Sequence, residues 1–174
     1  ELNEGIAPQL DAHAQVESRS LEGYYSKKIL DFETSLISLR YNQFHLGRVE
    51  QLGDKRIAAF QNASLLFGPE FKKITEFNPD YRELEDQEKQ VVLLYNGRVD
   101  LILIDKRVFL YFRRITSMTN TSMPVQYHDI PGLTIVSPAF VVFRTREMRD
   151  LFDEGLDLMM KSNHYYDIFY TYIR

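Results

Sequence analysis

The chain has 174 residues, 44% of them hydrophobic and 26% charged, and this ordinary globular composition excludes disordered and fibrous classes. Its formal net charge is −4, with basic and acidic residues interspersed, which argues against a nucleic-acid partner. Cysteine is absent, so no disulfide and no thiolate metal site can form. No apolar run approaches the ~20 residues that a membrane-spanning helix needs.

The first part of the chain carries few regular signals. Residues 1–30 are expected to be irregular, with short elements only. Residues 33–40 place β-branched and polar side chains at nearly alternate positions, which predicts a half-buried strand.

A strand that leads into a polar helix start is predicted next. Residues 56–60 form a short apolar strand. Asn62 suits the N-cap of a helix over residues 63–67, which Gly68 and Pro69 would close. This arrangement offers free backbone N–H groups to an anion.

The clearest predicted helix spans residues 82–95, with acidic side chains in its first turns and apolar side chains along one face. The Asn-Gly pair at residues 96–97 would end this helix in a left-handed cap. Residues 99–104 then predict a buried strand with Asp105 at its carboxyl end, and residues 106–115 predict another helix.

The alternation of strands and helices over residues 56–115 indicates an α/β layer with a largely parallel sheet. In such sheets ligands bind beyond the carboxyl ends of the strands. Residues 62–64 and Asp105 both lie at such ends.

The last third of the chain is expected to contain a polar connection, a strand and a long helix. Residues 116–129 predict the connection, and residues 133–144 predict a strand region that Pro138 breaks. Residues 146–161 keep their apolar positions at helical spacing. The aromatic tail over residues 165–172 is expected to pack a terminal helix onto the body of the protein.

Signatures of catalysis and of cofactor binding are absent from the sequence. No nucleophile elbow, phosphate-binding loop or dinucleotide fingerprint occurs. None of the four histidines has a partner at metal-ligand spacing. We therefore expect no catalytic residue, no metal and no cofactor.

Four segments carry family-like motifs in a fixed order. Arg19, followed by a Tyr-Ser pair at residues 25–26, matches "T-P-E-R-x-x-x-x-x-F-S-x-P-Y", and residues 51–64 (QLGDKRIAAFQNAS) match "L-G-K-x-V-A-V-x-x-G-T". Residues 95–105 (YNGRVDLILID) match "L-x-x-G-R-V-D-A-x-I-x-D". Residues 148–168 match "L-R-x-x-F-N-x-x-L-x-x-L-x-x-S-G-x-Y-x-x-I". Together these segments resemble the family 3 extracellular, or periplasmic, solute-binding proteins of the amino-acid-binding type.

The resemblance implies a two-lobed periplasmic-binding-protein-like α/β fold that closes on a ligand. Residues 1–35 and 130–174 would belong to lobe 1, and residues 36–129 would form a complete lobe 2. The strand–helix–strand motifs that open family members have no counterpart here, so lobe 1 is expected to be partial and the chain to lack its N-terminal part.

The resemblance also implies a ligand site. Arg19 matches the arginine that holds a ligand carboxylate, which suits the bidentate guanidinium fork. Asn62, Ala63 and Ser64 match the segment whose backbone N–H groups receive the carboxylate, although Ala63 stands where glycine is usual. Asp105 matches the aspartate that takes a ligand ammonium, a position at which a simple helix cap would look the same.

Two departures concern the choice of ligand. Val16 and Ala14 replace residues that carry hydroxyl donors in the family. These losses weaken the expectation of an amino acid and leave room for another small organic acid.

The implied function is capture of a small polar ligand, an amino acid by the default of the family, in the periplasm, after export, for a membrane ABC-type permease; an enzyme is not expected. One alternative is the ligand-sensing domain of a signalling protein, or an orphan binder. A further alternative is a cyclic dienyl acid dehydratase, for which no general acid can be singled out in the sequence.

Overall fold

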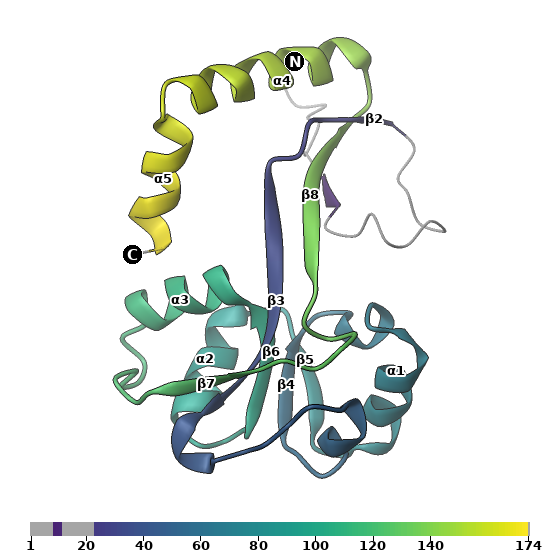
Figure 1. Ribbon diagram of the computed structural model, residues 1–174, viewed down its shortest axis with the longest axis vertical. Helices are drawn as coiled ribbons and strands as arrows, with labels where there is room; N and C mark the ends of the chain where they lie inside the picture. Colours follow the sequence, from purple (N-terminus) through teal and green to yellow (C-terminus); the bar gives the residue numbers. More distant parts are fainter. Residues whose placement is uncertain (1–8, 12–22, 174) are drawn as a thin grey trace, which may run out of the picture. The chain divides into compact units, whose positions relative to one another are not determined.

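The computed structural model describes residues 9–11 and 23–173 (Figure 1). The chain divides into two compact units, one of residues 1–32 and 136–174 and the other of residues 33–135. It passes between them twice, once within the third strand and once between residues 135 and 136. Both units combine helices and strands, so the protein is of the α/β class, as predicted.

The second unit is built on a mixed sheet. Its strands are β3 (Leu30–Leu39, which begins in the first unit), β4 (Ile57–Phe60), β5 (Tyr81–Leu84), β6 (Leu101–Asp105) and β7 (Val125–His128). Strand β4 pairs in parallel with β5 on one side and β6 on the other. Strand β3 pairs antiparallel with both β6 and β7. The three parallel strands therefore have their carboxyl ends at one edge of the sheet.

Helices cover both faces of this sheet. They are α1 (Gly68–Phe77), α2 (Gln87–Tyr95) and α3 (Lys106–Ile115). Alternate strand residues point to opposite faces. One set packs in a core with Phe71 of α1, and the other packs with Leu94 of α2 and Phe109 of α3. Figure 1 shows α2 and α3 together on one side of the strands and α1 on the other.

Strand β3 is more deeply buried than the sequence predicted, because helices cover both faces of the sheet. The sequence predicted a half-buried strand, but all residues from position 34 to position 39 are buried. Leu36 packs in one core and Ile37 in the other, because the strand is central in the sheet and has helices over both faces.

Capping residues fix both ends of helix α2 in the second unit. The Asp86 carboxylate accepts hydrogen bonds from the backbone N–H groups of Glu88 and Lys89, so α2 begins at residue 87. Gly97 has φ 64° just after α2, the left-handed conformation predicted for this cap. The predicted strand and helix that follow are confirmed, and α3 has the expected bounds.

Three predicted elements of this unit were wrong. Residues 82–84 belong to strand β5 rather than to a helix, because they pair in parallel with β4. Gly68 and Pro69 begin α1 instead of closing a helix, since proline is compatible with the first helical turn. Residues 125–128 form β7 within the segment that was expected to be a connection, because they pair with β3.

The first unit contains β8 (Val136–Phe143), paired antiparallel with β1 (Gln9–Asp11) and β2 (Tyr24–Tyr25). Pro138 lies inside β8 and does not break it, contrary to the prediction. The pairing with β1 involves residues 140–142 of β8, so Pro138 lies outside that ladder.

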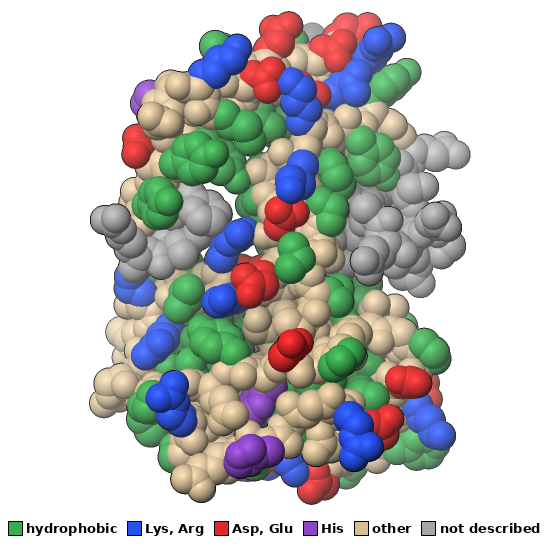
Figure 2. Space-filling model, viewed as in Figure 1, with side chains coloured by type: hydrophobic (Ala, Val, Ile, Leu, Met, Phe, Trp, Pro, Cys, Tyr) green, Lys and Arg blue, Asp and Glu red, His purple; other side chains and the backbone are tan. Residues whose placement is uncertain are grey.

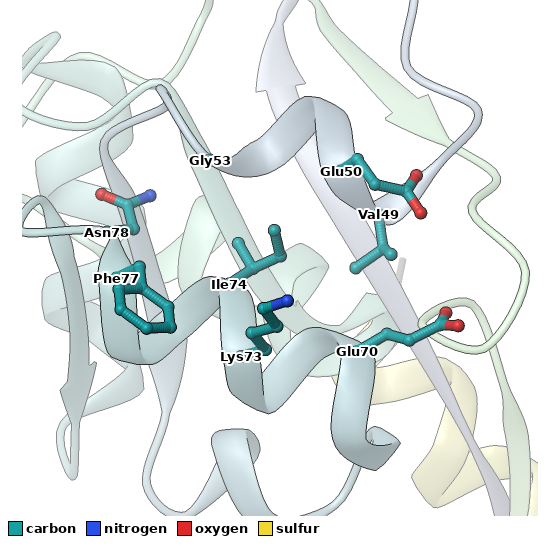
Figure 3. A pocket seen from close by; sticks show the side chains of 8 residues that line it. All are labelled: Val49, Glu50, Gly53, Glu70, Lys73, Ile74, Phe77 and Asn78. Carbon is teal, nitrogen blue, oxygen red and sulfur yellow. The ribbon is translucent and has the colours of Figure 1, made fainter.

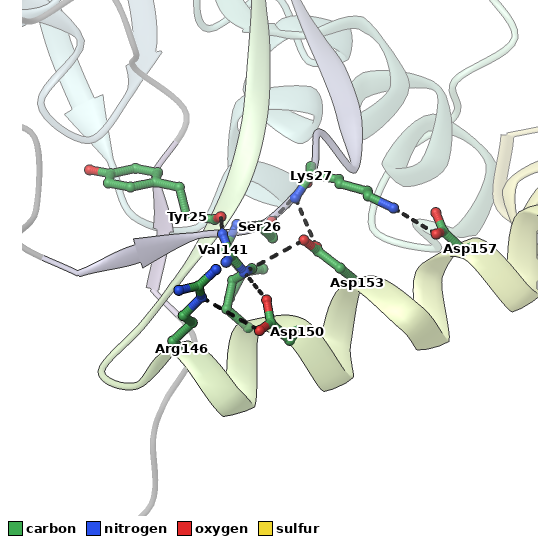
Figure 4. Close-up of polar contacts among 9 residues, drawn as sticks. Tyr25, Ser26, Lys27, Val141, Arg146, Asp150, Asp153 and Asp157 are labelled. Atoms are coloured by element: carbon green, nitrogen blue, oxygen red, sulfur yellow. Dashed lines mark hydrogen bonds and ion pairs between the residues drawn. The ribbon is translucent and has the colours of Figure 1, made fainter.

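Helices α4 (Arg146–Lys161) and α5 (His164–Ile173) follow β8. The predicted long helix is confirmed, with the Thr145 hydroxyl accepting from the N–H of Met148. The polar side of α4 binds the segment that precedes β3. The Asp153 carboxylate accepts the N–H of Lys27, and Asp157 pairs with the Lys27 ammonium at 2.6 Å (Figure 4).

The apolar side chains of these two helices are not all buried. Leu151 and Leu158 of α4 are about two-thirds exposed, at 64% and 66%. In the aromatic tail, the Tyr165 hydroxyl donates to the carbonyl of Ile29, but Tyr166 is about half exposed. Figure 2 shows hydrophobic side chains gathered over α5, whereas charged side chains dominate over α4. Within the described residues, no helix has both the length and the apolar character needed to cross a membrane.

Candidate functional site

The candidate site lies at the carboxyl ends of the parallel strands in the second unit. Asn62 follows β4 and has φ 64°, a left-handed conformation that asparagine tolerates better than most residues. A 3₁₀ turn, Ala63–Leu65, comes next, and the Ala63 methyl is buried in the core beneath it. The sequence placed a helix N-terminus here, whereas the structure has a single turn that directs backbone N–H groups outward from the strand end.

These N–H groups already have an acceptor. The Asn62 N–H donates to one oxygen of the Glu83 carboxylate at 2.6 Å, and the Ser64 N–H donates to the other at 2.8 Å. The Tyr81 hydroxyl donates to the same oxygen as Ser64, at 2.8 Å. Glu83 reaches them because β5 runs parallel to β4, with Glu83 beside Ala59 in the register. A carboxylate thus occupies the position that the sequence assigned to a ligand carboxylate.

The hydrogen bonds favour the ionised form of Glu83. Partial burial acts to raise the pKa of Glu83, but the bonds from Ser64, Tyr81 and Asn62 outweigh it and hold this pKa below its usual range. Burial and the neighbouring Glu83 together raise the pKa of Tyr81, so its hydroxyl remains a donor. The Glu83 carboxylate is therefore an anion that is bound by neutral hydrogen-bond donors.

Asp105, at the end of β6, is also held by backbone N–H groups. One oxygen accepts from Arg107 and Val108 at 2.8 and 3.0 Å, which caps α3. The other oxygen accepts from the N–H of Glu33 at 2.7 Å. The side chain is buried, with only 8% of the residue exposed. Asp105 thus serves as a helix cap and as a link to β3.

A cation lies next to Asp105 at the start of α3. The Lys106 ammonium pairs with the Glu33 carboxylate at 3.2 Å and lies 5.5 Å from the centre of the Tyr127 ring. Lys106 is thereby directed to Glu33 and Tyr127.

The predicted site residues are only partly brought together. Residues 62–64 and Asp105 follow adjacent parallel strands and lie at the same edge of the sheet. Arg19 falls outside the described residues, so its expected role stays a prediction. Sequence reasoning missed Glu83 and Tyr81 because it placed the former in a helix. Their two-residue spacing after an Asn-Pro turn at residues 78–79 was the available signal.

The amino end of the same sheet provides a contrast. Asp100 accepts the backbone N–H of Arg56 at 2.9 Å and pairs with the guanidinium of that residue at 2.6 Å. The same guanidinium donates to the carbonyl of Gly97. Burial acts to raise the pKa of Asp100, but the bonds from Arg56 keep it below its usual range. This carboxylate is neutralised by a side-chain cation, as suits a structural link.

A shallow pocket of about 390 Å³ lies elsewhere in this unit, between the 3₁₀ turn Val49–Leu52 and α1 (Figure 3). It is lined by Val49, Glu50, Gly53, Glu70, Lys73, Ile74, Phe77 and Asn78. None of these residues belongs to the predicted ligand site. Among the residues with described positions, no group of three or more His, Asp or Glu side chains is arranged to hold a metal ion.

Solved structures share this fold. The ligand-binding core of GluR0 in complex with L-glutamate superposes with a TM-score of 0.63 at 14% identity, covering 89% of this chain and 66% of that one. The arginine-, lysine-, histidine-binding protein ArtJ from Geobacillus stearothermophilus gives 0.62 at 16% identity, with 86% and 62% covered. A histidine kinase sensor domain with similarity to periplasmic binding proteins gives 0.61 at 16% identity, again with 86% and 62% covered.

These likenesses establish the fold class as that of the periplasmic binding proteins, in agreement with the motifs in the sequence. The chain spans about two thirds of the length of these structures or slightly less. No family model matches the sequence. No curated protein matches it either.

Proposed function

We propose that the chain is the ligand-capturing part of an exported solute-binding protein, which binds a small polar ligand in the periplasm and delivers it to an ABC-type permease. The observation that carries this proposal is the fold shared with amino-acid-binding proteins, with hydrogen-bonding groups gathered at the carboxyl ends of the parallel strands.

Within this proposal, Arg19, the segment of Asn62, Ala63 and Ser64, and Asp105 contribute to the ligand site. Arg19 would hold a ligand carboxylate. Asp105 would attract a ligand ammonium, since its charge is bound by N–H dipoles and not by a cationic side chain among the described residues. An amino acid or a small organic acid is the starting expectation.

A thermal-shift screen against amino acids, small organic acids and small amines tests this proposal. A ligand at about a hundred times its Kd adds about 2.7 kcal/mol of stability. For a chain of this size this corresponds to a Tm rise of roughly 5 °C or more. The rise should be lost in Arg19→Ala and reduced in Asp105→Asn, which keeps a helix-capping side chain. A panel without any rise would contradict the proposal.

Sensing is the alternative, because one structure of the same fold is a histidine kinase sensor domain. Crosslinking in membranes of the source cell separates the two roles. Recovery of a permease with the chain supports transport, whereas recovery of a membrane kinase supports sensing.

A further inference from the structure

Glu83 is the feature of the site that the proposed function does not use. Its carboxylate fills the backbone position expected to receive a ligand carboxylate, and both of its oxygens are engaged. The inference below rests on the proposed function and concerns which class of ligand this site accepts.

We propose that Glu83 is a specificity-determining residue that occupies the anion position with the protein's own carboxylate. The ligand group that meets this end of the sheet is then a cation, an amine or a guanidinium, and any ligand carboxylate lies away from these N–H groups. Ligands that must place a free carboxylate on the N–H groups of Asn62 and Ser64 are excluded.

Displacement of Glu83 is disfavoured by its hydrogen bonds. A ligand carboxylate would have to break the bonds from Asn62, Ser64 and Tyr81 and leave Glu83 without these donors. Binding next to Glu83 without displacing it would bring two carboxylates into close proximity, and like charges at such a distance repel. Either route penalises a carboxylate relative to a neutral or cationic group.

The charge balance of this edge favours a cation, because the Lys106 ammonium next to Asp105 is paired with the Glu33 carboxylate. Within the described part of the chain, neither Glu83 nor Asp105 takes part in an ion pair, whereas Asp100 at the opposite edge is paired with Arg56. Glu85, which is exposed and accepts a bond from the Gln61 amide, adds a further negative charge beyond β5. Carboxylates bound only by neutral donors keep their charge available to a ligand.

The direct test uses acetate as the probe and the backbone amides of Asn62 and Ser64 as reporters. In the unaltered protein these amide NMR signals should not show a saturable shift with acetate. Glu83→Ala uncovers the N–H groups, so both signals should shift saturably. Glu83→Gln keeps the volume of the side chain over these N–H groups, with one acceptor oxygen in place of two, and should still prevent acetate from binding. Glu85→Ala is the matched control and should behave like the unaltered protein.

Acetate-dependent shifts of equal affinity in the unaltered protein and in Glu83→Ala would overturn the proposal. So would the absence of any response in a folded Glu83→Ala protein, with folding judged from a dispersed amide spectrum. These outcomes do not depend on knowing the natural ligand, so they are distinct from a failed ligand screen.

Ligand pairs that differ by one carboxylate test the same point through affinity. Agmatine is arginine without its carboxylate, and cadaverine bears the same relation to lysine. We expect Glu83→Ala to shift the affinity ratio at least about tenfold toward the member that carries the carboxylate, because the N–H groups of Asn62 and Ser64 are then uncovered. Glu85→Ala should leave the ratio unchanged. An unchanged ratio in a folded Glu83→Ala protein would contradict the inference, and no binding of any compound in the full screen would contradict the proposed function instead.

Discussion

The two edges of the sheet in the second unit hold their carboxylates in different ways. At the amino end, Asp100 is bound by one backbone N–H and by the Arg56 guanidinium. At the carboxyl end, Glu83 and Asp105 are bound by backbone N–H groups, with a tyrosine hydroxyl added at Glu83. The first arrangement cancels charge and links two strands. The second fixes charge in place without cancelling it, which is the property that a cation-binding edge requires.

The largest effect is expected at Asp105. Asp105→Ala removes the cap of α3, which costs about 0.5–2 kcal/mol. It also leaves the N–H of Glu33 without its acceptor, at a cost of about 1–3 kcal/mol. We expect a total loss of about 1.5–5 kcal/mol in the free energy of unfolding, measured with urea. Asp105→Asn keeps a capping oxygen and should lose clearly less; an equal loss would show that the cap is not what Asp105 provides.

At the amino end, Asp100→Asn should lower the free energy of unfolding by about 1–2 kcal/mol at neutral pH, since a charge-assisted bond is lost. The pKa of Asp100 is depressed in the folded state. Its contribution is therefore complete above the unfolded pKa of about 3.9 and disappears as the pH falls through the lower folded value. Urea unfolding at several acidic pH values should show the variant and the unaltered protein converging. A constant difference would contradict the ion pair.

Glu83→Gln is expected to cost about 1 kcal/mol at neutral pH, because its single amide oxygen can accept from only one of the Asn62 and Ser64 N–H groups and its NH2 group faces the other. The pKa of Glu83 is also depressed, so this difference should likewise vanish on acidification. Salt distinguishes the stability effects at the two edges of the sheet. About 0.5 M NaCl screens the ion pair of Arg56 with Asp100 more than it screens the N–H dipoles that bind Glu83. The Asp100→Asn difference should shrink in salt while the Glu83→Gln difference persists; equal shrinkage would remove the contrast.

The smallest effect is expected away from both edges. Lys72 and Glu76 form an exposed pair at 3.9 Å on α1. Lys72→Ala should change the free energy of unfolding by less than about 0.5 kcal/mol. The same urea experiment sets the baseline for charge changes on this unit. A loss as large as that at Asp100 would mean that position at the sheet edge has no special importance.

The parts of the fold that the sequence predicted well carry dense local signals. Residues 101–104 are four consecutive apolar residues followed by Asp105, and the helix that follows has strong apolar periodicity. Strands β5 and β7 were missed because each has only four residues and mixes charged or polar side chains. Their state is decided by pairing with β4 and β3, a tertiary effect that short-range patterns do not contain.

The candidate site likewise has one part that the sequence predicted and one part that it did not. The position of residues 62–64 and of Asp105 at strand ends follows from local patterns and from the rule for parallel sheets. The contact of Glu83 with Asn62 and Ser64 depends on the register between β4 and β5, which brings Ala59 and Glu83 side by side. No pattern within one segment specifies that register, so the role of Glu83 could not be predicted from the sequence and was found only in the structure.

The central claim is that the ionised Glu83 carboxylate is bound to the N–H groups of Asn62 and Ser64. An acid titration of the unaltered protein, followed by the NMR signals of these two amides, tests it most directly. The account predicts that both signals titrate together, with one midpoint below the ordinary glutamate pKa of about 4.3. Their shifts should be absent in Glu83→Gln. Amide signals that do not respond to acid, or that respond equally in Glu83→Gln, would contradict the account.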